Sequence, residues 1–109
     1  MKIEIEDKEQ QLFPHNWELL TKKIQLFVDM QKFAMIENDG WVSNWKKYES
    51  AKWGLIINDG IVNERGVRAV GMNTRNSFVF GVTVKTLDIA EKMKEQFGDR
   101  INEIYNTQL

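Results

Sequence analysis

The residues whose types could support catalysis are few and scattered. His15 is the only histidine, and no carboxylate stands at a spacing that implies a general-base pair with it. We interpret His15 as an exposed residue at the start of a helix. No serine stands in the strand-to-helix elbow that nucleophilic hydrolases use. We therefore expect no catalytic residues and predict that the protein is not an enzyme.

Metal and cofactor chemistry finds equally little support. Glu4, Glu6 and Asp7 gather carboxylates near the N-terminus, but a calcium loop would add aspartates and a glycine at fixed offsets. The chain has no cysteine, which excludes thiolate ligands and disulfides. Its glycines form neither a P-loop nor a dinucleotide fingerprint. The sequence predicts no metal site and no cofactor.

An aromatic and basic segment is the strongest candidate for binding. Trp41, Trp45 and Tyr48 interleave with Lys46 and Lys47. Aromatic rings beside cations can stack the bases and pair the phosphates of a single nucleic-acid strand. The same rings could instead close one end of the core while the lysines face water. We leave both interpretations open and expect nucleic-acid binding to be weak at most.

Charge is distributed unevenly, although the formal net charge is only −1. Residues 40–85 carry seven basic and three acidic groups, whereas both ends of the chain are acidic. Gly54 and Gly81 fall inside expected strands, where a glycine often marks the close approach of another group. Together these features predict a binding surface. Its candidate residues are Trp41, Trp45, Lys46, Lys47, Lys52, Gly54, Arg65, Arg68, Arg75, Gly81 and Lys85.

The elements that would position this surface form one α+β domain. A chain of 109 residues, 42% of them hydrophobic, is most simply a single domain with its own core. We expect an N-terminal strand or arm over 1–14, a first helix over 15–37, a sheet over 41–85 and C-terminal helices over 86–106. No apolar run approaches a bilayer span, and the N-terminus lacks the apolar region of a signal peptide. We therefore expect a cytoplasmic protein.

The first helix carries a broad apolar stripe. Trp17, Leu20, Ile24 and Phe27 recur at helical spacing and predict the face that packs on the core. Leu19, Leu26, Met30 and Phe33 widen this stripe. Lys23 intrudes on the apolar side, so part of the stripe must lie near water. The run Asn38-Asp39-Gly40 predicts a turn that ends the helix.

A hairpin is the clearest element of the expected sheet. Asp59-Gly60 predicts a tight turn between a strand over 52–58 and a return strand that ends at Val70. Unbroken pairing would put Glu64 on the face of Leu55, where a carboxylate is costly. We therefore expect a bulge near Arg65-Gly66.

A further strand and the C-terminal helices complete the expected fold. Ser77–Lys85 alternates apolar and polar residues and predicts a strand. Thr86 is expected to cap a helix that ends at Gly98, with a short helix restarting at Asp99. The fold class is thus α+β, with a three- to four-stranded antiparallel sheet and two helices packed on one face.

The opposite face of this sheet is expected to be largely apolar and needs a cover. It carries Gly54, Ile56, Val79 and Gly81. Either the N-terminal segment and the connector 41–45 cover it, or a second subunit does. We favour a homodimer, because the connector is short.

From about Trp53 onward the chain resembles a module of small, mostly uncharacterised bacteriophage and prophage proteins. In that module an aromatic strand runs into a helix opened by threonine and carrying an Ala-Glu pair. Here these are NSFVFGVTV, Thr86 and Ala90-Glu91. The resemblance implies a phage or prophage accessory protein in a bacterial host cell, and it supplies no active site. We expect a non-enzymatic protein that binds a host or phage macromolecule. The alternative is a nucleic-acid-binding domain that uses the basic middle region.

Overall fold

A computed structural model describes residues 17–43, 45, 51–68 and 72–105. Its elements, in chain order, are α2 (Trp17–Asn38), β1 (Lys52–Asn58), β2 (Ile61–Val67), the single turn α3 (Met72–Arg75), the 3-10 turn η1 (Val79–Gly81) and α4 (Leu87–Tyr105). They confirm an α+β chain with two long helices and an antiparallel strand pair. The expected strand over 1–14, His15, Lys46 and Lys47 lie outside the described residues.

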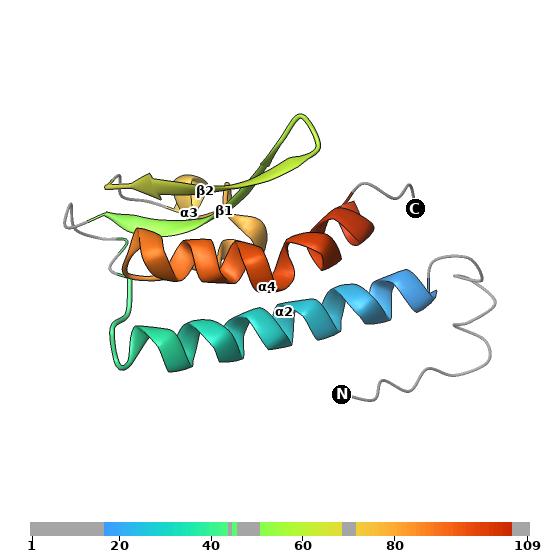
Figure 1. The fold of residues 1–109 in the computed structure, drawn as a ribbon, viewed down its shortest axis with the longest axis horizontal. Coiled ribbons are helices and arrows are strands. Elements are labelled where there is room, and N and C mark those ends of the chain that lie inside the picture. Colours follow the sequence, from blue (N-terminus) through green and yellow to red (C-terminus); the bar gives the residue numbers. More distant parts are fainter. Residues whose placement is uncertain (1–16, 44, 46–50, 69–71, 106–109) are drawn as a thin grey trace.

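The elements stack in three layers, with the hairpin on α4 and α4 on α2 (Figure 1). The two long helices run in opposite directions. Because α4 lies between the strands and α2, the expectation that both helices pack on one face of the sheet is not met. Helix α4 contacts both the hairpin and α2. Its buried residues are Ile89, Ala90, Met93, Phe97, Ile101 and Ile104.

The hairpin prediction is confirmed. β1 and β2 pair from Asn58↔Ile61 to Lys52↔Val67. Asp59 and Gly60 both have positive φ, at 53° and 76°, as the favoured two-residue hairpin turn requires. The predicted bulge near Arg65-Gly66 is wrong, because the pairing is unbroken and Leu55 lies opposite Glu64.

The inward Glu64 is tolerated because α4 supplies a cation. Its Oε2 lies 3.5 Å from the Nζ of Lys94. The carboxylate is therefore paired across the layers, and the cost that motivated the predicted bulge is offset by a contact that only the folded chain provides.

The predicted strand Ser77–Lys85 is wrong. Only Val84 pairs with β1, through a bridge to Trp53 in which each backbone N–H donates to the other residue's carbonyl, at 2.7 and 3.0 Å. Upstream, Phe80 and Gly81 have φ of 55° and 66°, and two successive left-handed residues turn the chain back on itself. The sheet of the described residues accordingly has two strands instead of the three or four expected.

The sheet face expected to be bare is covered by the chain itself. A Cβ added at Gly54 would meet the ring of Phe78 at 2.5 Å. The Trp45 ring lies against Phe78, with centroids 6.4 Å apart. Val79, expected on that face, belongs to the core. The observation that favoured a homodimer is therefore gone, and the dimer stays a prediction without that support.

Helix α2 buries only part of the predicted stripe, on the side that carries Leu26 and Met30. Its fully buried side chains are Leu26 and Met30, and Ala34 follows at the next turn. Two other residues of the predicted stripe, Leu20 and Phe27, lie on the neighbouring face and are 42% and 40% exposed. α2 therefore carries two apolar stripes, and packing on α4 selects one of them.

The ends of the helices follow the sequence with one exception. At the end of α2, Trp41 N–H donates to the Asn38 carbonyl, as a turn requires. At the start of α4, Ile89 N–H donates to the Thr86 hydroxyl at 3.3 Å, which confirms the predicted cap. The predicted end at Gly98 is wrong, because α4 runs unbroken to Tyr105. Within the described residues, neither helix is long and apolar enough to cross a bilayer.

Candidate binding trough

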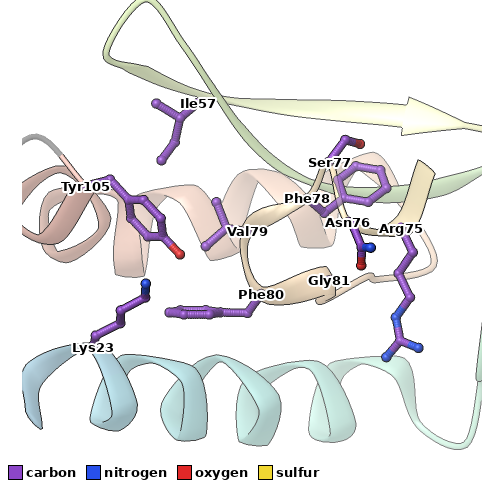
Figure 2. A pocket seen from close by; sticks show the side chains of 10 residues that line it. All are labelled: Lys23, Ile57, Arg75, Asn76, Ser77, Phe78, Val79, Phe80, Gly81 and Tyr105. Carbon is purple, nitrogen blue, oxygen red and sulfur yellow. The ribbon is translucent and has the colours of Figure 1, made fainter. Parts of the chain in front are cut away.

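Two adjoining hollows lie between α2 and the segment that follows α3. One has a volume of about 690 Å³ (Figure 2) and the other about 230 Å³. Arg75 and Gly81 line both, so we treat the two hollows as one surface, the Arg75 trough. The larger hollow is lined by Lys23, Ile57, Arg75, Asn76, Ser77, Phe78, Val79, Phe80, Gly81 and Tyr105. The smaller is lined by Gln31, Ala34, Met35, Asn38, Trp41, Val42, Ser43, Trp45, Arg75, Gly81, Val82 and Thr83.

Phe80 forms an aromatic wall of the larger hollow. Its left-handed backbone turns the side chain toward α2 (Figure 2). There the ring meets Phe27 edge-on, with centroids 5.3 Å apart, and lies 6.1 Å from the Tyr105 ring. A bulky residue with φ near 55° is a genuine outlier, and such strain persists only where surrounding contacts hold it. The chain thus stores strain at the point where it presents an aromatic ring to an open surface.

Gly81 makes room for Arg75. A Cβ at this position would lie 3.2 Å from the Arg75 Nε and 3.4 Å from its Cγ. The guanidinium stem therefore rests directly on the glycine backbone, at the junction of the two hollows. This is a close approach of the kind that a glycine in this segment predicted.

The trough is electrostatically one-sided. Its two linings include the cations Lys23 and Arg75 and no carboxylate. Among the described residues Arg75 has no ion pair, whereas Lys22, Lys94 and Arg100 are each paired with a carboxylate. Because the trough lacks acidic groups, it favours an anionic ligand.

Lys23 and Tyr105 meet at one end of the trough. The Lys23 Nζ lies 5.2 Å from the centre of the Tyr105 ring, within the range of a cation–π contact. Burial raises the pKa of the Tyr105 hydroxyl above its ordinary value, so the hydroxyl stays protonated at neutral pH. This end of the trough therefore presents an ammonium group and a neutral hydroxyl.

A hydrogen-bond network supports the other end. The Asn38 amide donates to the Thr83 carbonyl at 3.0 Å and its oxygen accepts from the Lys85 N–H at 3.1 Å. The Ser43 and Thr83 hydroxyls share a further hydrogen bond. These contacts fasten the end of α2 to the segment before α4, and so hold Trp41 beside the smaller hollow.

Lys52 supports the Trp45 side of the trough through a contact with the Trp45 ring. It is fully buried, and its Nζ lies 5.1 Å from the centre of the Trp45 ring. Trp45 in turn packs on Phe78, which fills the space above Gly54. Lys52 and Gly54, both predicted to belong to a binding surface, therefore act as its support.

The other predicted binding residues that the structure describes lie either in the trough or outside it. Trp41, Trp45, Arg75 and Gly81 come together in the trough. Arg65 and Arg68 are exposed and do not line it, and Lys85 contributes a backbone contact from an exposed position. Sequence reasoning missed Tyr105 and assigned Lys23 no role, although its intrusion on the apolar side of the helix was the available signal.

Outside the trough, the described residues offer little other chemistry. They contain no group of three His, Asp or Glu side chains that could hold a metal ion. A hollow of about 360 Å³ between α2 and α4 contains the Asp29–Arg100 ion pair, whose N–O distance is 2.9 Å. Because each charge of that pair is already compensated, the hollow lacks the unbalanced charge that marks the Arg75 trough.

Comparison with known proteins identifies no relative: no family model, no curated protein and no solved structure matches this chain.

Proposed function

We propose that this chain is a non-enzymatic binding protein that recognises a partner macromolecule through the Arg75 trough. The observation that supports the proposal is the trough's lining, which joins two cations to aromatic and aliphatic side chains and lacks carboxylates. Binding surfaces combine apolar anchors with a few placed polar groups in this way. The aromatic strand of the phage and prophage module is not formed here, but the helix capped by Thr86 and carrying Ala90-Glu91 remains, and this part of the resemblance supports a host or phage macromolecule as the partner.

Exposed apolar side chains beside the trough favour a protein as that partner. Met35 and Val42, which line the smaller hollow, are 74% and 81% exposed. Clustered exposed apolar groups of this kind mark sites of protein interaction. The chain would therefore bury this surface against its partner.

The experiment compares capture by two charge variants. The protein, Arg75→Glu and Arg65→Glu are immobilised and exposed to bacterial lysate. Arg65 is an exposed arginine of β2 outside the trough, so Arg65→Glu makes the same charge change at a control site. We expect one species to be retained by the protein and by Arg65→Glu and to be lost from Arg75→Glu. Equal retention of that species by Arg75→Glu would show that the trough does not recognise the partner.

A single nucleic-acid strand is the second candidate partner. Trp41, Phe80 and Tyr105 are rings on which bases could stack, and Lys23 and Arg75 could pair phosphates. Titration with labelled single-stranded DNA is expected to give an affinity no tighter than about micromolar at physiological salt, as non-specific electrostatics provides. Loss of the captured species after nuclease treatment, together with nanomolar DNA binding, would favour this candidate.

A further inference from the structure

The position of Arg75 between two hollows that each have polar and apolar side chains in their lining narrows the class of partner. We propose, resting on the function above, that the trough binds an extended peptide segment in which one carboxylate side chain is flanked on both sides by apolar side chains. Arg75 would pair with the carboxylate, and each hollow would receive one apolar group.

The charges that line the trough support an acidic residue at the centre of such a peptide. Among the described residues Arg75 has no ion pair, and neither hollow contributes a carboxylate that could compete for it. A guanidinium group can bind a carboxylate through two parallel hydrogen bonds. Gly81 holds the stem of Arg75 at the junction of the hollows, which places this charge at the middle of the trough.

The apolar side chains that line the two hollows support apolar residues on both sides of the acidic residue of the peptide. Met35, Trp41 and Val42 line the smaller hollow. Ile57, Phe80 and Tyr105 line the larger one. An apolar side chain placed in either hollow would remove surface of both partners from water.

The same observations argue against a nucleic-acid strand as the occupant. Phosphate contacts dominate the affinity of such strands, and the trough supplies only Lys23 and Arg75 as cations. Lys23 is already engaged with the Tyr105 ring. Phe80 contacts both Phe27 and Tyr105, which limits the ring surface left for stacking. A peptide needs one charge contact and two apolar contacts, and the trough provides these.

The test selects peptides from a display library of random linear sequences. The full chain is expected to enrich peptides with Asp or Glu between aliphatic or aromatic residues. Arg65→Glu is expected to enrich the same motif, whereas Arg75→Glu should lose it and favour Lys or Arg at the central position. An enriched peptide resynthesised with Gln or Asn in place of its acid should bind at least about tenfold more weakly.

A fold control and a second variant keep the result interpretable. Circular dichroism should show the same helix content in Arg75→Glu as in the unmodified chain. If it does not, Arg75→Gln replaces it and should weaken the enriched peptide without inverting the central charge.

Two outcomes would overturn the peptide proposal. One is the absence of an acidic motif among peptides enriched by the full chain, or the absence of enrichment. The other is tighter binding of a short oligothymidylate than of any enriched peptide, with loss of that binding in Arg75→Glu. In either case the proposed function still stands if Arg75→Glu loses the species captured from lysate, and it fails if that capture is unchanged.

Discussion

At the scale of single residues, the trough depends on a few polar and conformational contacts. Asn38 is 7% exposed and joins two backbone groups of the 83–85 segment through both ends of its amide. Both hydrogen bonds are partly buried, so removal of this side chain leaves a carbonyl and an N–H that have lost their partner in a place that water reaches only in part. Asn38 therefore fixes how α2 meets the segment that leads into α4.

The substitution Asn38→Ala is expected to lower the free energy of unfolding by about 2–4 kcal/mol, because it orphans the Thr83 carbonyl and the Lys85 N–H. Urea denaturation followed by circular dichroism measures the change. Asn63→Ala is the matched control: Asn63 is exposed on β2, its side chain accepts only an exposed 3.5 Å hydrogen bond from Lys94 among the described residues, and its loss should cost within roughly 0.5 kcal/mol. Equal effects of the two substitutions would show that the Asn38 contacts contribute nothing specific.

At the scale of elements, the same substitution is expected to have different effects on stability at two positions. This holds for two leucines of α2 and for two glycines, one in β1 and one in α4. Leu26 lies on the stripe that α4 buries, and Leu20 lies on the stripe that remains partly exposed. Gly54 stands in close contact with Phe78, whereas Gly98 has only the Lys94 side chain near it, at 3.9 Å. Packing around an element, more than its pattern, decides what a substitution costs.

Leu26→Ala should lower the free energy of unfolding by roughly 2–5 kcal/mol, as expected for a fully buried leucine. Leu20→Ala removes the same atoms from a side chain that is 42% exposed and should cost less than about 1 kcal/mol. Paired denaturation curves measure both. A larger loss from Leu20→Ala would mean that the side of α2 that carries Leu20 faces the core.

Substitution of Gly98 and of Gly54 by alanine is expected to change the free energy of unfolding in opposite directions. Gly98→Ala should raise the free energy of unfolding by about 0.5–1 kcal/mol, because Gly98 lies inside α4 with space for a methyl group. Gly54→Ala should lower it, because the methyl group would stand 2.5 Å from Phe78 and 2.9 Å from the Val82 carbonyl oxygen. Thermal melts of the two variants measure the shifts. Destabilisation by Gly98→Ala would contradict the unbroken helix.

At the scale of the whole molecule, ion pairs join α2 to α4 along the surface. Lys22 Nζ lies 2.7 Å from Glu103 Oε1, and Arg100 Nη1 lies 2.9 Å from Asp29 Oδ2. Burial alone would raise the pKa of Asp29, but hydrogen bonds from Gln25 and Arg100 outweigh it and hold the pKa below its ordinary value. The contact between these layers therefore depends on pH.

The sign of that dependence follows from the lowered pKa of Asp29. Its contribution to stability is fully present above the unfolded pKa of about 3.9 and is lost as the pH falls through the lower folded pKa. Asp29→Asn should therefore be less stable than the unmodified chain at neutral pH, by up to about 1 kcal/mol, and equal to it in strong acid. Urea midpoints measured across the acid range test this. Glu95→Gln, an exposed site on α4, should show no such convergence.

Short-range chemistry let the sequence predict several elements by itself. Asp59-Gly60 set the hairpin because few residue pairs accept two positive φ angles, and Thr86 set the start of α4 because its hydroxyl can accept an exposed helix N–H. Leu55 was correctly placed on the core side of β1. Each of these outcomes depends on neighbours within a few positions along the chain.

Long-range packing decided the rest. The two stripes of α2 are both apolar, so only the surface offered by α4 could choose Leu26 over Leu20. The alternation of apolar residues in Ser77–Lys85 would also fit a strand. In the structure, however, Phe78 fills the space above Gly54 and the chain turns at Phe80-Gly81. The trough joins Lys23, Arg75 and Tyr105 from distant parts of the chain. Such contacts depend on how whole surfaces fit, and a local pattern carries no information about the surface that it will meet.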